Sequence, residues 1–131
     1  MPSDTKNVQD GIAAYERGDY AVALGIFSPL ANEGDTRAEY GLGLIYANGR
    51  GAAQDYAASI KWFERAAAKG LADAQFSLGS RYYHGQGVAQ DFNIAFGCFT
   101  KAAEQGHVMA QFNLAVLHKD GLAPQAKPPR P

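Results

Sequence analysis

Residues Ala74–Met109, AQFSLGSRYYHGQGVAQDFNIAFGCFTKAAEQGHVM, decide the fold of this chain, because they repeat the 36 residues before them without a gap. Thirteen of the 36 positions are identical between this stretch and residues 38–73. A half copy follows at residues 110–121, and a partial copy precedes both units within residues 6–34. A period of roughly 20 to 50 residues is typical of a solenoid, in which neighbouring units stack to bury a shared core.

Each unit has the pattern of two helices joined by a turn. In the second helix of the first full unit, apolar residues at i, i+4, i+7 and i+11 form a single stripe. An aspartate precedes each second helix and is predicted to cap it, and a glycine follows each helix and ends it. The capping aspartates are Asp19, Asp55 and Asp91. The spacing predicts helices at about residues 7–17, 20–32, 36–47, 56–69, 72–83, 92–105 and 108–119.

These seven helices predict an all-α fold, an α/α solenoid of about three and a half helical hairpins. The short links make neighbouring helices antiparallel. Small residues recur where two helices are expected to approach closely, as at Gly43, Gly79 and Ala115 in the first helices. We expect one domain over residues 1–121, divided into a hairpin at 6–34, repeats at 38–73 and 74–109 and a half repeat at 110–121, with a proline-rich disordered tail at 122–131.

Composition excludes several classes of partner. The chain has 131 residues, a formal net charge of −1 and no basic cluster, whereas nucleic acids and acidic membranes attract concentrated Lys and Arg. We therefore expect neither nucleic acid nor a membrane as the partner. No apolar run is long enough to cross a bilayer, and residues 1–10 lack the apolar core of a secretory signal. A cytoplasmic protein is expected, although a chain whose signal had been removed would look the same.

The order Ala-x-aromatic-x-Leu-Gly, Tyr, Gly-x-Gly, Gln-Asp-aromatic, Phe, Ala-Ala and Gly resembles the Sel-one-like repeat (SLR), a helical hairpin related to the tetratricopeptide repeat (TPR). The match covers about residues 18–121. The resemblance implies a right-handed solenoid, a bacterial protein, and a non-enzymatic adaptor or scaffold that binds a protein or peptide without a cofactor. Some bacterial members bridge each unit with paired cysteines, and this chain departs from that branch because Cys98 is its one cysteine.

Comparison of the copies separates fixed positions, which carry the architecture, from variable positions, which are free for another role. In the first helices the variable positions lie at i, i+4, i+7 and i+11, so they form one stripe on each helix. They are Arg37, Gly41, Leu44 and Asn48, then Asp73, Ser77, Ser80 and His84, then Met109, Asn113, Val116 and Asp120. In tetratricopeptide-like folds the first helices line the concave face, so the resemblance places the stripes there as a partner-binding strip.

Several side chains of this strip suit an extended peptide. Ser77, Ser80 and Asn113 can form hydrogen bonds with its backbone, and Arg81 and Lys119 flank the strip and can pair with a carboxylate. The residues that we expect to contact a partner are Arg37, Leu44, Asn48, Asp73, Ser77, Ser80, Arg81, Tyr83, His84, Asn113, Val116 and Lys119. The alternative is that these positions are merely solvated and vary for that reason.

Other motifs point away from catalysis and metal binding. His84, His107 and His118 show neither i, i+4 spacing nor a supporting carboxylate, so we predict no metal site. His118 replaces a tyrosine of the other units, which favours a packing role. Cys98 falls at a core position of a second helix and is interpreted as a core residue. We predict that the chain is not an enzyme; a small hydrolase site within the groove has no positive support.

The last helix has no second helix after it. Phe112, Leu114, Val116 and Leu117 would then lack a covering partner, so either the tail folds back over them or another chain does. We therefore hold a second hypothesis beside the adaptor, in which the module self-associates weakly through residues 110–118.

Overall fold

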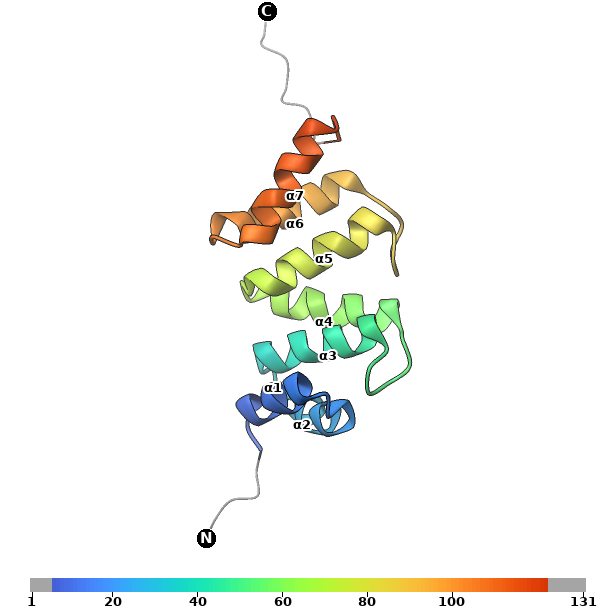
Figure 1. Cartoon of the computed structure of the whole chain (residues 1–131), viewed down its shortest axis with the longest axis vertical. Coiled ribbons are helices and arrows are strands. Elements are labelled where there is room, and N and C mark those ends of the chain that lie inside the picture. Colours follow the sequence, from blue (N-terminus) through green and yellow to red (C-terminus); the bar gives the residue numbers. More distant parts are fainter. Residues whose placement is uncertain (1–5, 123–131) are drawn as a thin grey trace, which may run out of the picture.

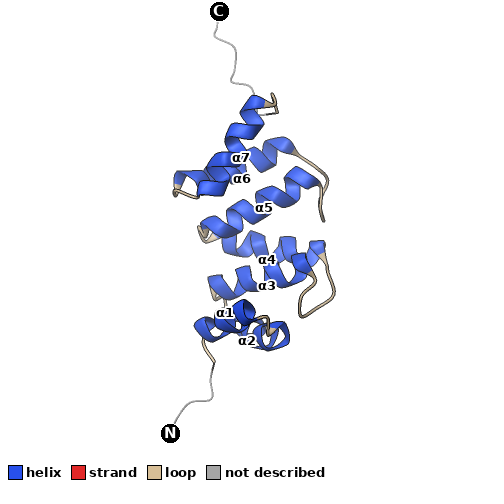
Figure 2. Cartoon of the chain, viewed as in Figure 1, coloured by secondary structure: helices blue, strands red, loops and turns tan. Residues whose placement is uncertain are grey.

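The computed structural model describes residues 6–122, and within them it shows the seven predicted helices in a single stack (Figure 1). The helices are α1 Val8–Arg17, α2 Tyr20–Asn32, α3 Thr36–Asn48, α4 Tyr56–Ala68, α5 Ala72–His84, α6 Phe92–Glu104 and α7 Val108–Lys119. Each helix packs on the next along the chain, with α1 and α7 at opposite ends of the stack. The described part contains no strand (Figure 2). The predicted all-α solenoid is confirmed; the tail predicted for residues 122–131 lies outside the described residues except for Leu122.

Two of the three predicted aspartate caps are present. Asp55 and Asp91 precede α4 and α6 with extended backbones, and each carboxylate accepts a hydrogen bond of 3.0 Å from a backbone N–H of the first turn. The predicted cap at Asp19 is wrong, because its side chain makes no hydrogen bond to α2. Asp19 follows the left-handed Gly18 directly, and its backbone is not extended (φ −84°, ψ 68°). Its carboxylate turns outward and accepts from Arg17 Nε at 3.0 Å instead.

Phenylalanines at equivalent positions of the second helices form the centre of the core. Phe27, Phe63 and Phe99 are each at most 2% exposed. Their rings lie directly against glycines of the first helices: a Cβ added at Gly43 would lie 2.4 Å from the Phe63 ring, and one at Gly79 would lie 2.7 Å from the Phe99 ring. The close approach predicted from the small residues is therefore confirmed at these two positions.

A repeated hydrogen-bond pair ties the end of each second helix to the first helix of the same unit and to the turn that precedes that unit. Lys69 Nζ, at the end of α4, donates to the Glu39 carboxylate at 3.0 Å and to the Gly34 carbonyl oxygen at 2.7 Å. One unit later, Gln105 Nε2 donates to Gln75 Oε1 at 3.0 Å and to the Gly70 carbonyl at 2.9 Å. The second contact reproduces the first with amides in place of charges.

The glycine loops dock on the preceding unit. Gly87 adopts a left-handed backbone (φ 82°), and a Cβ there would lie 2.7 Å from Cβ of Tyr56, so only glycine fits. Gln86, beside it, donates to the Tyr56 hydroxyl at 3.2 Å. Arg50 makes the equivalent bond to the Tyr20 hydroxyl at 3.1 Å. The loops thus hold neighbouring units together on the side away from the Lys69 and Gln105 contacts.

Within residues 6–122, none of the helices combines the length and the apolar character that a transmembrane span requires.

Candidate partner-binding face

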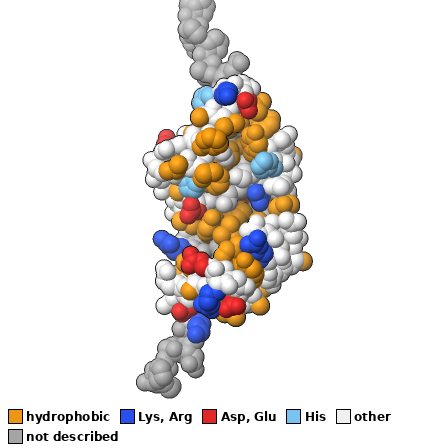
Figure 3. Space-filling view, in the orientation of Figure 1, with side chains coloured by type: hydrophobic (Ala, Val, Ile, Leu, Met, Phe, Trp, Pro, Cys, Tyr) orange, Lys and Arg blue, Asp and Glu red, His pale blue; other side chains and the backbone are white. Residues whose placement is uncertain are grey.

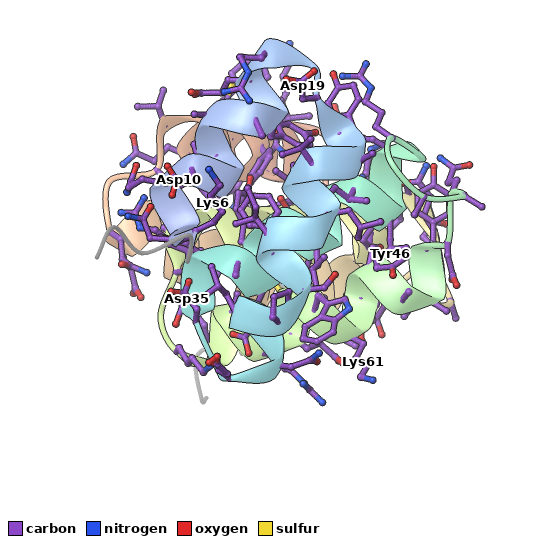
Figure 4. All side chains as sticks on the ribbon, turned by 90° about the horizontal axis from the view of Figure 1, so that it is seen from below. Lys6, Asp10, Asp19, Asp35, Tyr46 and Lys61 are labelled. Atoms are coloured by element: carbon purple, nitrogen blue, oxygen red, sulfur yellow. The ribbon has the colours of Figure 1, made fainter. Side chains whose placement is uncertain are left out.

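The first helices of the hairpins, α1, α3, α5 and α7, form one face of the stack, which is nearer the viewer in Figure 1. We call it the first-helix face. In the space-filling view apolar side chains run along the middle of this face, with charged side chains to either side (Figure 3). The second helices form the opposite face, where Arg65 and Lys61 lie over the Trp62 ring at 4.9 and 5.6 Å from its centroid. Seen along the stack, Lys61 points away from the core (Figure 4).

Two cavities open on the first-helix face. The N-terminal cavity, of about 380 Å³, lies between α1 and α3 and reaches the start of α5. It is lined by Ile12, Tyr15, Glu16, Phe27, Arg37, Tyr40, Gly41, Leu44, Leu71 and Asp73. The C-terminal cavity, of about 210 Å³, lies between α5 and α7 and is lined by Ser80, Tyr83, His84, Phe99, Phe112, Asn113 and Val116.

The two cavities occupy equivalent positions two units apart. Phe27 lines one and Phe99 lines the other, 72 residues later. Likewise the run Tyr40, Gly41 and Leu44 in the first is replaced 72 residues later by Phe112, Asn113 and Val116 in the second. The walls share an aromatic and an aliphatic residue, while the third member changes from glycine to asparagine. The repeat architecture has therefore produced the same recess twice.

Eight of the twelve residues predicted to contact a partner line these cavities. Arg37, Leu44 and Asp73 belong to the N-terminal cavity, and Ser80, Tyr83, His84, Asn113 and Val116 belong to the C-terminal one.

Two further predicted residues support the cavity walls. Asn48 donates to the Tyr15 hydroxyl at 3.2 Å, and Tyr15 lines the N-terminal cavity. Burial raises the pKa of the Tyr40 phenol in the same wall, while a hydrogen bond with Ser77 acts in the opposite direction. Asn48 therefore holds an aromatic wall residue in place, and Ser77 lies beside another.

The last two predicted residues lie outside both cavities. The Arg81 guanidinium sits 5.3 Å from the centre of the Tyr56 ring, at the junction with the preceding unit. Burial lowers the pKa of Arg81 there, with Tyr56 acting in the opposite direction. Lys119 is exposed at the end of α7. Neither side chain lines the recesses that a peptide would enter.

Comparison of the copies missed the α1 side of the N-terminal cavity, which Ile12, Tyr15 and Glu16 provide. The opening hairpin lacks the glycine loop, so α1 does not align with the other first helices. The apolar spacing of Ile12 and Tyr15 on α1 is the signal that could have found them. The comparison also missed Phe27, because a position that stays fixed between units was assigned to packing alone.

The three histidines have structural contacts. His107 Nδ1 accepts from the Ala110 amide at 3.1 Å and so caps α7, while its Nε2 lies 3.0 Å from Asp73. His118 packs edge-on against Phe96 at 5.4 Å, which confirms its predicted packing role, and His84 packs edge-on against Tyr83 at 4.9 Å. Across the described residues, no group of three or more His, Cys, Asp or Glu is placed to hold a metal ion.

Cys98 is half-buried on α6. Burial raises the pKa of its thiol, and Lys101 acts in the opposite direction. A thiol held in its protonated form is a poor nucleophile, which agrees with the interpretation of Cys98 as a core residue.

Comparisons with known proteins agree with this architecture. The model of the Sel1 repeat matches residues 36–71, 72–107 and 108–128, with the same 36-residue period and boundaries two residues earlier than the predicted units. A Sel1 repeat protein from Oxalobacter formigenes is 30% identical with a TM-score of 0.83 over 88% of this chain and 47% of its own. The protective antigen c5321 of uropathogenic Escherichia coli, which displays an SLR fold, is 34% identical with a TM-score of 0.76 over 88% of this chain and 29% of its own. No curated protein sequence matches. The chain thus spans less than half the length of either solved structure.

Proposed function

Because the chain belongs to the Sel1 repeat family, whose helical repeats are generally protein-interaction modules, we propose that it is a non-enzymatic adaptor that binds a protein or peptide along its first-helix face. The observation that carries the proposal is the pair of equivalent cavities on that face. The net charge of −1 supports a protein or peptide partner over nucleic acid or an acidic membrane surface.

The cavities fit the side chains of an extended segment. Their floors are the phenylalanine rings of Phe27 and Phe99, which favour apolar side chains. Ser80 and Asn113 on the rim of the C-terminal cavity provide hydroxyl and amide groups for hydrogen bonds to a peptide backbone. The polar groups would orient the segment while the recesses hold its apolar anchors.

The spacing of the cavities limits the length of the segment. Packed helices lie about 10 Å apart, and successive first helices lie at least that far apart, so two units separate the cavities by at least about 20 Å. An extended chain rises about 3.3 Å per residue, so the two anchors would lie at least about six residues apart. The rim of the N-terminal cavity carries the exposed charges of Glu16, Arg37 and Asp73, which would select the residues flanking the first anchor.

Selection of peptides tests the proposal. A phage-displayed library of random peptides of about twelve residues is panned on the immobilised chain, and recovered peptides are measured by fluorescence anisotropy. Leu44→Glu and Val116→Glu place a carboxylate in either cavity and are expected to weaken binding at least about tenfold, a loss of about 1.4 kcal/mol. Ala57→Glu, on the exposed side of α4, is the matched control and is expected to bind as wild type. Recovered peptides that bind all three variants equally would contradict the proposal.

A second candidate function is self-association through the open end of the stack. Its support is Phe112 on α7, which is 62% exposed although it is equivalent to the half-buried Tyr40 and Phe76.

A further inference from the structure

One face of α7 is bare where the equivalent faces of α3 and α5 are covered. The positions equivalent to this face are buried or half-buried on α3, where α4 covers them, and on α5, where α6 covers them. On α7 all five are exposed, and among residues 6–122 no later helix covers them. We call them the open face: Val108, Gln111, Phe112, Ala115 and Lys119.

The burial of the side chains on α7 differs in part from the prediction made from the sequence. Leu117 was predicted to be uncovered and is fully buried, and Leu114 and Val116 are half-buried. Leu114 and Leu117 belong to the cluster that includes Phe99 of α6, and Leu122 packs back against the same cluster. Among the four residues predicted to be uncovered, Phe112 is the one that is exposed, at 62%.

The other units show what kind of group fills the equivalent site. The Phe63 ring lies 5.8 Å from the Tyr40 ring and against Gly43. The Phe99 ring lies 5.6 Å from the Phe76 ring and against Gly79. Each site is thus an aromatic ring and a small residue, three positions apart on a first helix, that together hold a phenylalanine.

The open face repeats this site without its occupant. Phe112 stands at the aromatic position and Ala115 at the small position. Residues 121–131 contain no aromatic residue, so they supply no ring to this site.

We propose that a second copy of this chain covers the open face, with α7 antiparallel to the partner's α7 and the Phe112 ring of each copy on Ala115 of the other. Phe112 is itself the exposed aromatic side chain that the site requires. A two-fold pairing uses the same contact twice, so one residue satisfies both sites. This inference rests on self-association, the second candidate function, and adds the residues through which the two copies would associate.

Charge complementarity favours the antiparallel orientation. Pairing Phe112 with the partner's Ala115 brings Lys119 to the N-terminal end of the partner's α7. Asp73 lies at that end, bonded to His107 at 3.0 Å and with its side chain 59% exposed. The ammonium of Lys119 therefore approaches an acidic residue, and the two helix dipoles oppose each other.

The size of the contact predicts a weak dimer. A helix of 12 residues is about 18 Å long, and one face of it is smaller than the roughly 800 Å² per partner of a standard stable interface. Dimerisation in the micromolar range or weaker is expected.

Sedimentation equilibrium over about 1 μM to 1 mM protein measures the association. The wild-type mass is expected to rise towards the dimer. Phe112→Ser and Ala115→Glu are expected to weaken dimerisation at least about tenfold, with unchanged circular dichroism. Ile94→Ser changes an apolar side chain that is 44% exposed on α6 and serves as the control, expected to dimerise as wild type. A wild type that stays monomeric throughout would contradict both self-association and the pairing.

Cross-linking tests the pairing separately. In a Cys98→Ser background, Phe112→Cys and Ala115→Cys proteins are mixed and oxidised, and a disulfide between the two is expected to exceed the homodimers formed by either alone. A concentration-dependent dimer without this preference would overturn the α7 contact and leave self-association standing. Ala115 does not line the C-terminal cavity, so Ala115→Glu separates dimerisation from peptide binding on the first-helix face.

Discussion

The ammonium group of Lys69 lies 3.0 Å from the carboxylate of Glu39, thirty residues earlier in the chain. The contact joins the end of the second helix of a unit to the start of the first helix of the same unit. The Glu39 side chain is 3% exposed and that of Lys69 is 41% exposed. Gln105 and Gln75 make the same contact one unit later without a charge. The chain therefore makes the same contact once with a charged pair and once with a neutral pair.

Removing the ammonium should destabilise the fold more than removing the equivalent amide. Lys69→Met leaves the buried Glu39 carboxylate without its partner and is expected to lower the free energy of unfolding by about 2 kcal/mol. Gln105→Met removes neutral hydrogen bonds and should cost about 1 kcal/mol. Urea denaturation monitored by circular dichroism measures both.

The double variant Glu39→Gln/Lys69→Gln is the control for this prediction. It copies the Gln75–Gln105 contact and should restore the free energy of unfolding to within about 1 kcal/mol of wild type. A double variant as unstable as Lys69→Met would mean that the buried charge is not the cause of the loss.

Two glycine substitutions on helices should have opposite signs. In Gly43→Ala the new Cβ would lie 2.4 Å from the Phe63 ring, and the expected loss is about 1–2 kcal/mol because the core ring must shift. In Gly97→Ala the Cβ meets nothing within 4 Å, so the higher helix propensity of alanine should stabilise the protein by about 0.5–1 kcal/mol. Thermal unfolding of the two proteins distinguishes them, and equal shifts in Tm would argue against the close packing at Gly43.

The three aspartates that precede second helices should contribute unequally to the free energy of unfolding. Asp55→Ala and Asp91→Ala each remove a carboxylate that accepts from the first turn of a helix, and each is expected to cost about 1 kcal/mol. Asp19→Ala removes an exposed pair with Arg17 and should cost less than about 0.5 kcal/mol. Chemical denaturation of the three variants measures the loss in free energy of unfolding for each. A loss for Asp19→Ala as large as for the other two would contradict the prediction.

Cys98 should react slowly while the protein is folded. Burial raises the pKa of its thiol, so at about pH 8 the folded chain holds less thiolate than the unfolded chain. Reaction with a disulfide reagent is expected to be at least about tenfold slower in native buffer than in denaturant. Because the folded pKa exceeds the unfolded one, this group lowers stability as pH rises through the unfolded pKa. Equal reaction rates in the two conditions would show that the thiol is not protected.

The fold was predictable because it depends on spacing within each unit. The stripe that includes Phe63, the glycines that follow the helices and the 36-residue period are all local patterns, and each one is present in the structure. The Asp19 error has a local cause as well, since a two-residue turn leaves no extended residue to act as a cap.

Contacts between helices, within a unit and between units, were less accessible to prediction. The bond from Lys69 to Glu39 depends on how the two helices of one unit pack, and the place of Arg81 on Tyr56 depends on how one unit is rotated on the next. Spacing along the chain carries little information on that rotation. For the same reason the sequence did not distinguish Leu117, which packs in the cluster with α6 and is buried, from Phe112, which is exposed.

One extended segment is proposed to occupy both cavities of the first-helix face. Methyl-labelled nuclear magnetic resonance tests it directly, because Leu44 lines one cavity, Val116 lines the other, and Val22 and Ile94 are exposed on second helices. Titration with a selected peptide is expected to shift the Leu44 and Val116 methyl signals together at one peptide per chain, with Val22 and Ile94 unchanged. Shifts at Val22 and Ile94 without shifts at Leu44 and Val116 would contradict the claim.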